Sequence, residues 1–251
     1  MLGFMGQEVA KLCSDGYRGA SLAFGVDPNA SASSSHSVYP TFSDIISTEG
    51  VDCIVDFSHH AATPTLLDFA TDKNLPIVLA TTGHTEEEIS LIHEASKKIP
   101  VFYSGNMSLG IALLIELAKS AALAMPEASI EIIEKHHVRK IDAPSGTALM
   151  IANAIKEIRP DSYENLGRSG HGKRTKEEIG IHSVRMGNIV GEHEVIIGTN
   201  NQTITLKHEA HSRALFAEGA LAAAEFIIGC KAGLYDMNSI ITADKSDAVL
   251  A

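Results

Sequence analysis

A chain of 251 residues can bury a full hydrophobic core, as one large domain or as two smaller ones. Its formal net charge of −11 and its lack of a basic stripe argue against a nucleic-acid partner, because phosphate backbones are bound by clustered cations. No apolar run approaches the ~18 residues that span a bilayer, the first residues do not resemble a signal peptide, and three scattered cysteines form neither a disulfide framework nor a metal knuckle. We therefore expect a cytoplasmic protein with no membrane partner.

The first part of the chain alternates short apolar runs with longer helical patterns. Two of these runs are apolar without alternation, which is typical of strands buried on both faces of a parallel sheet. The strands predicted here are residues 21–26, 52–57, 76–80 and 101–104. Helices are predicted over residues 60–72 and 85–98, and the polar run 29–37 predicts a surface loop. This order indicates a doubly wound, Rossmann-like α/β domain.

A different pattern follows a helix predicted over residues 108–125. Residues 129–134 alternate, with Ile130 and Ile132 on one face, and lead into a histidine-rich run. The later predicted strands are residues 179–184, 189–197 and 202–208, and the later helices are residues 147–158 and 214–230. Successive strands of this kind indicate an α+β region with a mixed sheet, so we expect two domains.

Glycines and an acid near the N-terminus fit the second half of a dinucleotide-binding fingerprint. Gly3-Phe4-Met5-Gly6 opens a predicted helix, and Asp27 closes the next predicted strand. The glycines would let the backbone approach a pyrophosphate and the acid would hold ribose hydroxyls, although a simple glycine turn explains the pattern equally well. Only Met1 and Leu2 precede Gly3, where the fingerprint needs a strand, so we expect a truncated sequence whose first, central strand is missing.

The run from Glu134 to Ala148 is the most informative part of the chain. It combines two adjacent imidazoles with three cations, and a helix start follows at once. Backbone N–H groups at a helix start bind anions, and imidazole moves protons near neutral pH. We therefore expect a pocket that holds a carboxylate or phosphate and transfers a proton.

Less specific interpretations of the same residues remain open. His136 and His137 could be an edge-strand pair without a role, Lys140 a solvated loop lysine, and Gly146-Thr147 only a helix entry capped by Ser145 or Asp142. Metal binding is disfavoured because adjacent residues on a strand point to opposite faces, so no metal is predicted. The basic, glycine-rich run 168–174 predicts a surface loop that might instead close over the pocket.

These motifs resemble the 4-hydroxy-tetrahydrodipicolinate reductase family, also called dihydrodipicolinate reductases. The run from Glu134 to Ala148 resembles the signature of that family, and the similarity extends over essentially the whole chain from Gly3. Further matches are Val55-Asp56-Phe57-Ser58, Ala80-Thr81-Thr82-Gly83, Gly105-Asn106-Met107-Ser108, the run from Arg185 to His193, and Gly233-Leu234-Tyr235-Asp236-Met237.

The resemblance implies reduction of 4-hydroxy-tetrahydrodipicolinate, a cyclic dicarboxylate, to tetrahydrodipicolinate in lysine and diaminopimelate biosynthesis. It implies that His136 is the general acid/base and that Lys140 donates a proton and contacts the substrate. His137 would contact a substrate carboxylate, and Gly146 and Thr147 would offer it backbone N–H groups.

The resemblance also implies NADH or NADPH as cofactor and a homotetramer built by the second domain. The residues that would line the cofactor, besides the N-terminal glycines, are Ala80, Thr81, Thr82, Ser104, Gly105, Asn106 and Met107. Met107 stands where the family usually carries an aromatic residue. The chain would return to the first domain at its end, so we expect residues 1–107 and 217–251 to bind the dinucleotide and residues 108–216 to bind the substrate and form oligomer contacts.

Asp27 followed by Pro28 and Asn29, with no adjacent arginine, favours NADH, because an acid repels a ribose 2′-phosphate. An alternative function is a catalytically impaired dicarboxylate-binding protein, if the shortened glycine loop no longer binds a dinucleotide. A third is a related nicotinamide enzyme that acts on a different acid.

Overall fold

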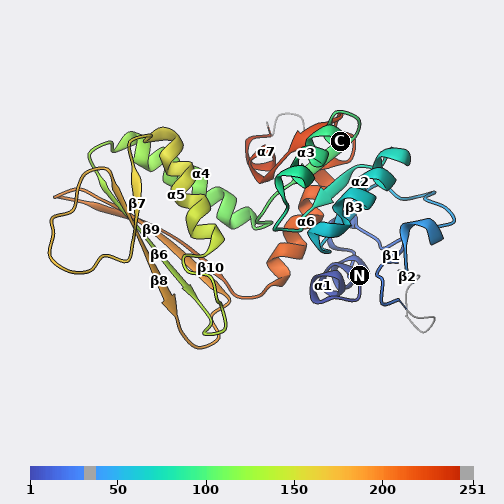
Figure 1. The fold of residues 1–251 in the computed structure, drawn as a ribbon, viewed down its shortest axis with the longest axis horizontal. Helices are drawn as coiled ribbons and strands as arrows, with labels where there is room; N and C mark the ends of the chain where they lie inside the picture. Colours follow the sequence, from blue (N-terminus) through green and yellow to red (C-terminus); the bar gives the residue numbers. More distant parts are fainter. Residues whose placement is uncertain (31–37, 244–251) are drawn as a thin grey trace. The chain divides into compact units, whose positions relative to one another are not determined.

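The computed structural model describes residues 1–30 and 38–243, so most of the predicted loop 29–37 and the end of the chain lie outside the described residues. The chain forms two compact units (Figure 1). The first consists of Met1–Ser108 together with the segment that begins at Ala214, and the second is Leu109–Arg213. Within the described residues, no helix has both the length and the apolar character needed to cross a membrane.

A four-stranded parallel sheet forms the centre of the first unit. Its strands, in spatial order, are β11 (Gly233–Tyr235), β5 (Pro100–Tyr103), β4 (Ile77–Leu79) and β3 (Ile54–Asp56). Its main helices are α1 (Phe4–Ser14), α2 (Thr63–Asp72), α3 (Glu86–Ser96) and α6 (Ala214–Ile227). Shorter elements are η1 (Tyr17–Gly19), β1 (Gly25–Val26), β2 (Val38–Tyr39), η2 (Phe42–Asp44), η3 (His60–Ala62) and α7 (Met237–Thr242).

Both faces of this sheet are covered, which explains why its strands are apolar without alternation. Ile77, Leu79 and Val101 share a core with residues of α2 and α3. Phe102 points the other way, and its ring centroid lies 6.4 Å from that of Phe226 on α6. Helix α1 packs on α6. The predicted doubly wound α/β arrangement with a parallel sheet is therefore confirmed.

Some boundaries differ from the prediction. The strand predicted over residues 21–26 is short, because within the described residues only Gly25 and Val26 of that segment pair, in parallel, with β2. The helix predicted from residue 60 begins as the 3₁₀ turn η3 and becomes α-helical at Thr63, with a proline in its first turn. Strands β2 and β11 and helix α7 are not predicted, because so few residues show no periodicity.

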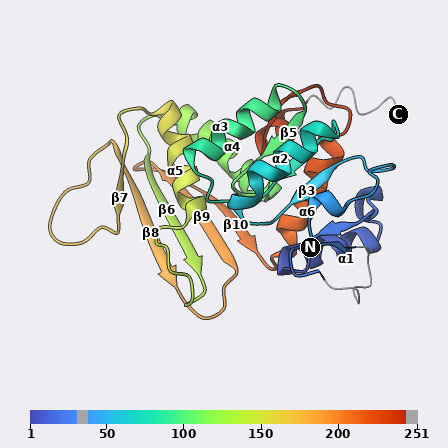
Figure 2. The ribbon, with the colours of Figure 1, turned by 45° about the vertical axis from the view of Figure 1, so that its right-hand side comes forward.

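The second unit is a five-stranded mixed sheet covered by two helices on one face (Figure 1; Figure 2). The strands, in spatial order, are β10 (Thr203–Ala210), β9 (Gly191–Gly198), β6 (Ser129–His136), β8 (Glu178–Arg185) and β7 (Tyr163–Leu166). The helices are α4 (Leu109–Ala124) and α5 (Gly146–Ile158). Strand β6 is parallel to β8 and antiparallel to β9, which confirms the predicted mixed sheet.

Alternation along the central strands produces the core of this unit. Ile130 and Ile132 of β6, together with apolar residues of β8 and β9, pack against α4 and α5. The intervening residues of β6 are only partly buried, as expected for a sheet with one covered face. This pattern determines which polar side chains of β6 face the helices.

Candidate active site

The covered face of β6 ends in two polar residues. The two-residue period that buries Ile130 and Ile132 also places Glu134 and His136 on that face. Glu134 is 0% exposed and His136 is 9% exposed. The buried face of β6 therefore continues from apolar side chains to a carboxylate and an imidazole.

Three groups donate hydrogen bonds to the buried Glu134 carboxylate. Arg185 binds it through two nitrogens, with Nη1–Oε2 and Nη2–Oε1 distances of 2.8 and 2.7 Å. His136 Nδ1 lies 2.6 Å from Oε2, and the Ser145 backbone N–H donates to Oε1 at 3.1 Å. Desolvation by burial raises the pKa of Glu134, but the hydrogen bonds from His136 and Arg185 outweigh it and hold the pKa well below its usual range. Glu134 is therefore ionised.

The register of the sheet assembles this cluster from three strands. Arg185 of β8 lies opposite His136, and His193 of β9 lies opposite Glu134. The His193 ring meets the His136 ring edge-on, with centroids 5.2 Å apart. Burial lowers the pKa of His193 to about 3, so this second imidazole is uncharged near neutral pH.

The start of α5 belongs to the same cluster. Ser145 is the N-cap, and its Oγ accepts a hydrogen bond from the Ala148 N–H at 3.2 Å and lies 3.0 Å from His193 Nε2. Gly146 opens the helix and is exposed, and Thr147 follows it. Helix starts favour anions because of their backbone N–H groups and their dipole. Of the two candidate caps, Ser145 and Asp142, the structure has Ser145 as the N-cap.

The loop between β6 and α5 carries the other predicted residues. Lys140 Nζ lies 2.8 Å from Asp142 Oδ1, and Arg185 Nη2 donates to the Asp142 carbonyl at 2.6 Å. His137 Nδ1 is buried and has no hydrogen-bond partner among the described residues. Burial, with the charges of neighbouring arginines, lowers the pKa of His137. The structure thus connects His136 to the helix start through Glu134 and to the Lys140 loop through Arg185.

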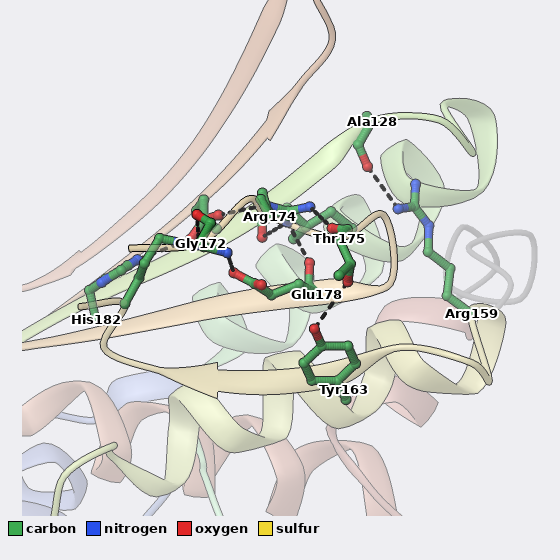
Figure 3. A network of polar contacts seen from close by, with 11 residues as sticks. Ala128, Arg159, Tyr163, Gly172, Arg174, Thr175, Glu178 and His182 are labelled. Atoms are coloured by element: carbon green, nitrogen blue, oxygen red, sulfur yellow. Dashed lines mark hydrogen bonds and ion pairs between the residues drawn. The ribbon is translucent and has the colours of Figure 1, made fainter. Parts of the chain in front are cut away.

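The basic run 168–174 is attached at the other end of the same strands (Figure 3). Arg168 pairs with Glu178, the first residue of β8. Arg174 donates to Glu131 Oε1 at 3.0 Å and to the Ile130 carbonyl at 2.9 Å, near the start of β6. Both anchors are therefore at the opposite strand ends from His136 and Arg185, which favours the surface-loop interpretation.

In the first unit, the predicted glycine start and Asp27 lie together. Gly3 is the N-cap of α1 and supplies no side-chain cap. The Asp27 carboxylate accepts hydrogen bonds from the N–H groups of Leu2 at 2.8 Å and Asn29 at 2.9 Å, and lies 3.1 Å from the Met1 amino group. An uncapped helix start beside an acid suits a pyrophosphate and a ribose.

The other residues of the Gly3-Phe4-Met5-Gly6 run differ from one another in exposure. Phe4 is 57% exposed, and Met5 is half-buried. A Cβ on Gly6 would stand 2.3 Å from the Met1 carbonyl oxygen, so Gly6 is needed for that close approach. The glycine at this position therefore has a structural reason of its own, apart from any contact with a ligand.

The other predicted cofactor residues follow the ends of β4 and β5. Ala80 is buried, Thr81 is buried and donates to Asp56 Oδ2 at 2.7 Å, and Thr82 is exposed. Ser104 Oγ donates to the Asn106 carbonyl at 2.8 Å, which closes a turn around the exposed Gly105. Carboxyl ends of parallel strands meet at one edge of the sheet, which is where doubly wound sheets bind ligands.

Met107 ends this turn and packs directly on α6. Its side chain is 2% exposed, and a Cβ on Gly219 would stand 1.7 Å from the Met107 carbonyl oxygen. Gly219 is not predicted from the sequence, although a glycine inside a helical pattern often marks a close contact. Nor are individual roles predicted for Glu134, Arg185 and His193; the spacing of Glu134 and His136 on an alternating strand was the available signal.

Among residues 1–30 and 38–243, no group of three or more His, Cys, Asp or Glu side chains is arranged to hold a metal ion. His136 and His137 have different surroundings, as expected for neighbours at the end of a strand. His136 is bonded to Glu134, whereas His137 lies in the loop that follows β6. The two imidazoles therefore do not form a common ligand pair.

Comparison with known proteins identifies the family. Two family models match, described as the N-terminus of dihydrodipicolinate reductase over residues 1–107 and its C-terminus over residues 110–241. The 4-hydroxy-tetrahydrodipicolinate reductase of Caldanaerobacter subterraneus subsp. tengcongensis is 48% identical, over 95% of this chain and 94% of the relative. That of Clostridium tetani is 45% identical, over 91% of this chain and 90% of the relative.

Solved structures agree. A dipicolinate-bound dihydrodipicolinate reductase from a Paenisporosarcina species has a TM-score of 0.79 at 26% identity and covers 96% of both chains. A Corynebacterium diaminopimelate dehydrogenase in complex with diaminopimelate has a TM-score of 0.58 at 12% identity, with coverage of 100% of this chain and 96% of that chain, and shares the fold alone. With both family models matched and relatives above 40% identity over nearly its full length, the chain belongs to the dihydrodipicolinate reductase family of oxidoreductases.

Proposed function

We propose that this chain reduces 4-hydroxy-tetrahydrodipicolinate to tetrahydrodipicolinate with a reduced nicotinamide dinucleotide. The observation that carries the proposal is the buried, ionised Glu134, which binds both His136 and the N-cap of α5. The net reaction adds one hydride and one proton and releases water. It therefore needs a proton donor beside a site for two carboxylates, and we propose that residues of the second unit supply both.

Each predicted residue receives a role on this basis. His136 acts as general acid/base, because its ring lies at the polar end of the core and is oriented by a carboxylate. Lys140 donates a proton and contacts the substrate once it exchanges Asp142 for a substrate carboxylate. His137 and the backbone N–H groups of Gly146 and Thr147 bind the carboxylates, which helix starts favour.

The residues of the first unit fit a dinucleotide. Gly3, Phe4, Met5 and Gly6 would approach the pyrophosphate, since the start of α1 has no side-chain cap. Asp27 would hold ribose hydroxyls, and the residues at the ends of β4 and β5 would line the nicotinamide half: Ala80, Thr81, Thr82, Ser104, Gly105, Asn106 and Met107. When bound, this cofactor supplies the hydride.

We infer a preference for NADH. Asp27 lies at the end of β1, and hydrogen bonds from Asn29 and Leu2, with the charge of the amino terminus, outweigh burial and lower its pKa. An ionised carboxylate there repels a ribose 2′-phosphate. Comparison of kcat/KM with NADH and with NADPH tests this; a clear preference for NADPH would contradict it.

We also infer a homotetramer assembled by the second unit, as implied by the family resemblance. The uncovered face of its sheet includes side chains that are only partly buried, among them Ile133 and Ile196. Light scattering on the purified chain should give four times the monomer mass. A monomer at micromolar concentration would refute the homotetramer but would not contradict the proposed catalytic roles.

The test of the proposed function is turnover of the named substrate. An aldolase-type synthase would generate 4-hydroxy-tetrahydrodipicolinate in the cuvette, and loss of NADH absorbance would be followed with and without this chain. We expect oxidation of NADH only when substrate and chain are both present. Binding of dipicolinate without any turnover would instead indicate a dicarboxylate-binding protein, and turnover of another acid in its place would indicate a related reductase.

A further inference from the structure

We propose that Glu134 is a positioning residue that fixes, with its two oxygens, both the proton-transfer atom of His136 and the anion-binding start of α5. This inference rests on the proposed reduction, in which His136 and the residues after Ser145 act on one substrate. Glu134 itself contacts no substrate in this scheme. It works through the two groups that it holds.

The Glu134 carboxylate is fully buried. A carboxylate with 0% exposure is costly unless it is paired and hydrogen-bonded. Arg185 supplies the pair in a two-pronged geometry that leaves one further lone pair on each oxygen. His136 takes the one on Oε2, and the Ser145 N–H takes the one on Oε1. The carboxylate thus connects strand β6 with helix α5.

The contact with Glu134 also determines the tautomer of His136. An ionised carboxylate only accepts hydrogen bonds, so Nδ1 must carry the hydrogen in the 2.6 Å contact. Nε2 is then the ring atom that can exchange a proton with the substrate. A Cβ on Gly191 would lie 3.1 Å from Nε2, so a glycine at that position keeps this side of the ring uncrowded.

The same carboxylate also holds the start of α5. Ser145 is held from two sides, by Glu134 at its N–H and by His193 at its hydroxyl. These contacts fix the position from which Gly146 and Thr147 present their backbone groups. If the Glu134 carboxylate is lost, the imidazole and the helix start should both shift, so proton transfer and carboxylate binding should weaken together.

The chain contains its own control for this arrangement. Glu131, also on β6, accepts a hydrogen bond from Arg174 at 3.0 Å and lies 3.0 Å from a His182 ring nitrogen. Its side chain is 30% exposed, and it lies on the opposite face of the strand. Glu131→Gln therefore removes the same kind of carboxylate–arginine–histidine contact without touching the candidate site.

The experiment compares Glu134→Gln, Glu134→Asp and Glu131→Gln in the full chain. Folding is checked by circular dichroism, because a neutral residue beside the half-buried Arg185 can destabilise the unit. Glu134→Asp keeps the charge and remains informative if the Gln variant does not fold. In Glu134→Gln we expect kcat to fall by at least about tenfold, up to about 10⁴-fold as when a histidine loses the acid that sets its tautomer. The dissociation constant of dipicolinate should rise about tenfold.

Nitrogen-15 NMR of labelled histidines supplies a readout that does not depend on turnover. Above the titration of the ring, the His136 signals, assigned by their loss in His136→Gln, should report hydrogen on Nδ1 in the unchanged chain and in Glu131→Gln. The tautomer should change in Glu134→Gln and partly in Glu134→Asp. Hydrogen on Nε2 in the unchanged chain, or normal kcat and dipicolinate affinity in both folded Glu134 variants, would overturn the proposal. If the unchanged chain never turns over the substrate but these tautomer and affinity changes occur, the proposed function fails and the positioning role stands.

Discussion

At the scale of single residues, His136 and Lys140 are the two side chains proposed to move protons, and they have different partners. His136 is bonded to a buried carboxylate, whereas Lys140 pairs with Asp142, whose side chain is 51% exposed. The lysine can therefore change partners at little cost, because exposed ion pairs contribute little free energy. The imidazole cannot move without breaking the Glu134 cluster.

His136→Gln and Lys140→Cys should each lower kcat at least ~100-fold, which is the scale expected when a general acid or base is lost. Steady-state assays with the generated substrate measure this. His182→Gln and Lys119→Cys are matched controls, since each residue is also paired with a glutamate, Glu131 and Glu157 respectively, and neither glutamate belongs to the candidate site. Near-normal turnover in either test variant would remove that residue from the mechanism.

The buried His193 should make the protein sensitive to mild acid. Burial lowers its pKa in the folded state to about 3, whereas the unfolded chain takes up this proton near the ordinary pKa of about 6.5. The unfolded state then binds more protons as the pH falls, so the free energy of unfolding decreases below about pH 6.5. Between about pH 7 and about pH 5, this one group should account for a loss of about 2 kcal/mol.

Urea unfolding at both pH values tests that effect, with His193→Gln as the variant. The variant should lose about 2 kcal/mol less on acidification than the unchanged chain, whatever its stability at neutral pH. Glu134 does not produce the effect in this window, because its lowered pKa matters only below the ordinary range of a carboxyl. Equal pH dependence in the two proteins would contradict this prediction, because it would show that the folded and unfolded chains take up the His193 proton at the same pH.

At the scale of elements, α6 packs closely against the turn that ends at Met107, a contact that is not predicted from the sequence. Gly219→Ala would place a Cβ 1.7 Å from the Met107 carbonyl oxygen, so the helix or the turn must move. We expect a lower melting temperature and an NADH dissociation constant raised at least about tenfold, an estimate for loss of about one well-placed hydrogen bond. Thermal unfolding and NADH fluorescence titration measure both quantities.

Gly172→Ala is the control for that variant, because a Cβ there meets nothing within 4 Å and its φ is not positive. It should leave both the melting temperature and the NADH affinity unchanged. If Gly219→Ala binds NADH normally and melts normally, the turn tolerates displacement and has no positioning role.

Sequence predicts elements well where they are periodic or form an unbroken apolar run. The alternation of β6 and the unbroken apolar runs of β4 and β5 predict both the strands and the kind of sheet. Strands β2, β7 and β11 show neither an alternation nor an unbroken apolar run, so they are not predicted. The Glu134–Arg185 contact also cannot be predicted from the sequence, because it joins β6 to β8 across 51 positions and depends on the register of the two strands.

At the scale of the whole molecule, the predicted binding residues divide between the two units. All described hydrogen bonds and ion pairs of Asp27 lie in the first unit, and those of Glu134 and Ser145 lie in the second. Cofactor affinity and dicarboxylate affinity should therefore change independently of each other, although turnover needs both.

Asp27→Ala should raise the NADH dissociation constant at least about tenfold and leave the dipicolinate dissociation constant within about twofold. His137→Ala should do the reverse. Fluorescence titration for NADH and calorimetry for dipicolinate give the two constants on the same samples. A variant that weakens both ligands equally would indicate that the units are coupled even when only one ligand is present.

Strand β6 also sets a strict limit on how this chain can diverge. Its even-numbered residues face the helices and its odd-numbered residues face away. A residue of this strand therefore reaches the candidate site only from an even-numbered position. One inserted or deleted residue between Ile132 and Glu134 would turn the acid and its imidazole outward and bring Lys135 inward against the helices. A substitution within these eight residues keeps the alternation, whereas a change in their number reverses it for every residue that follows.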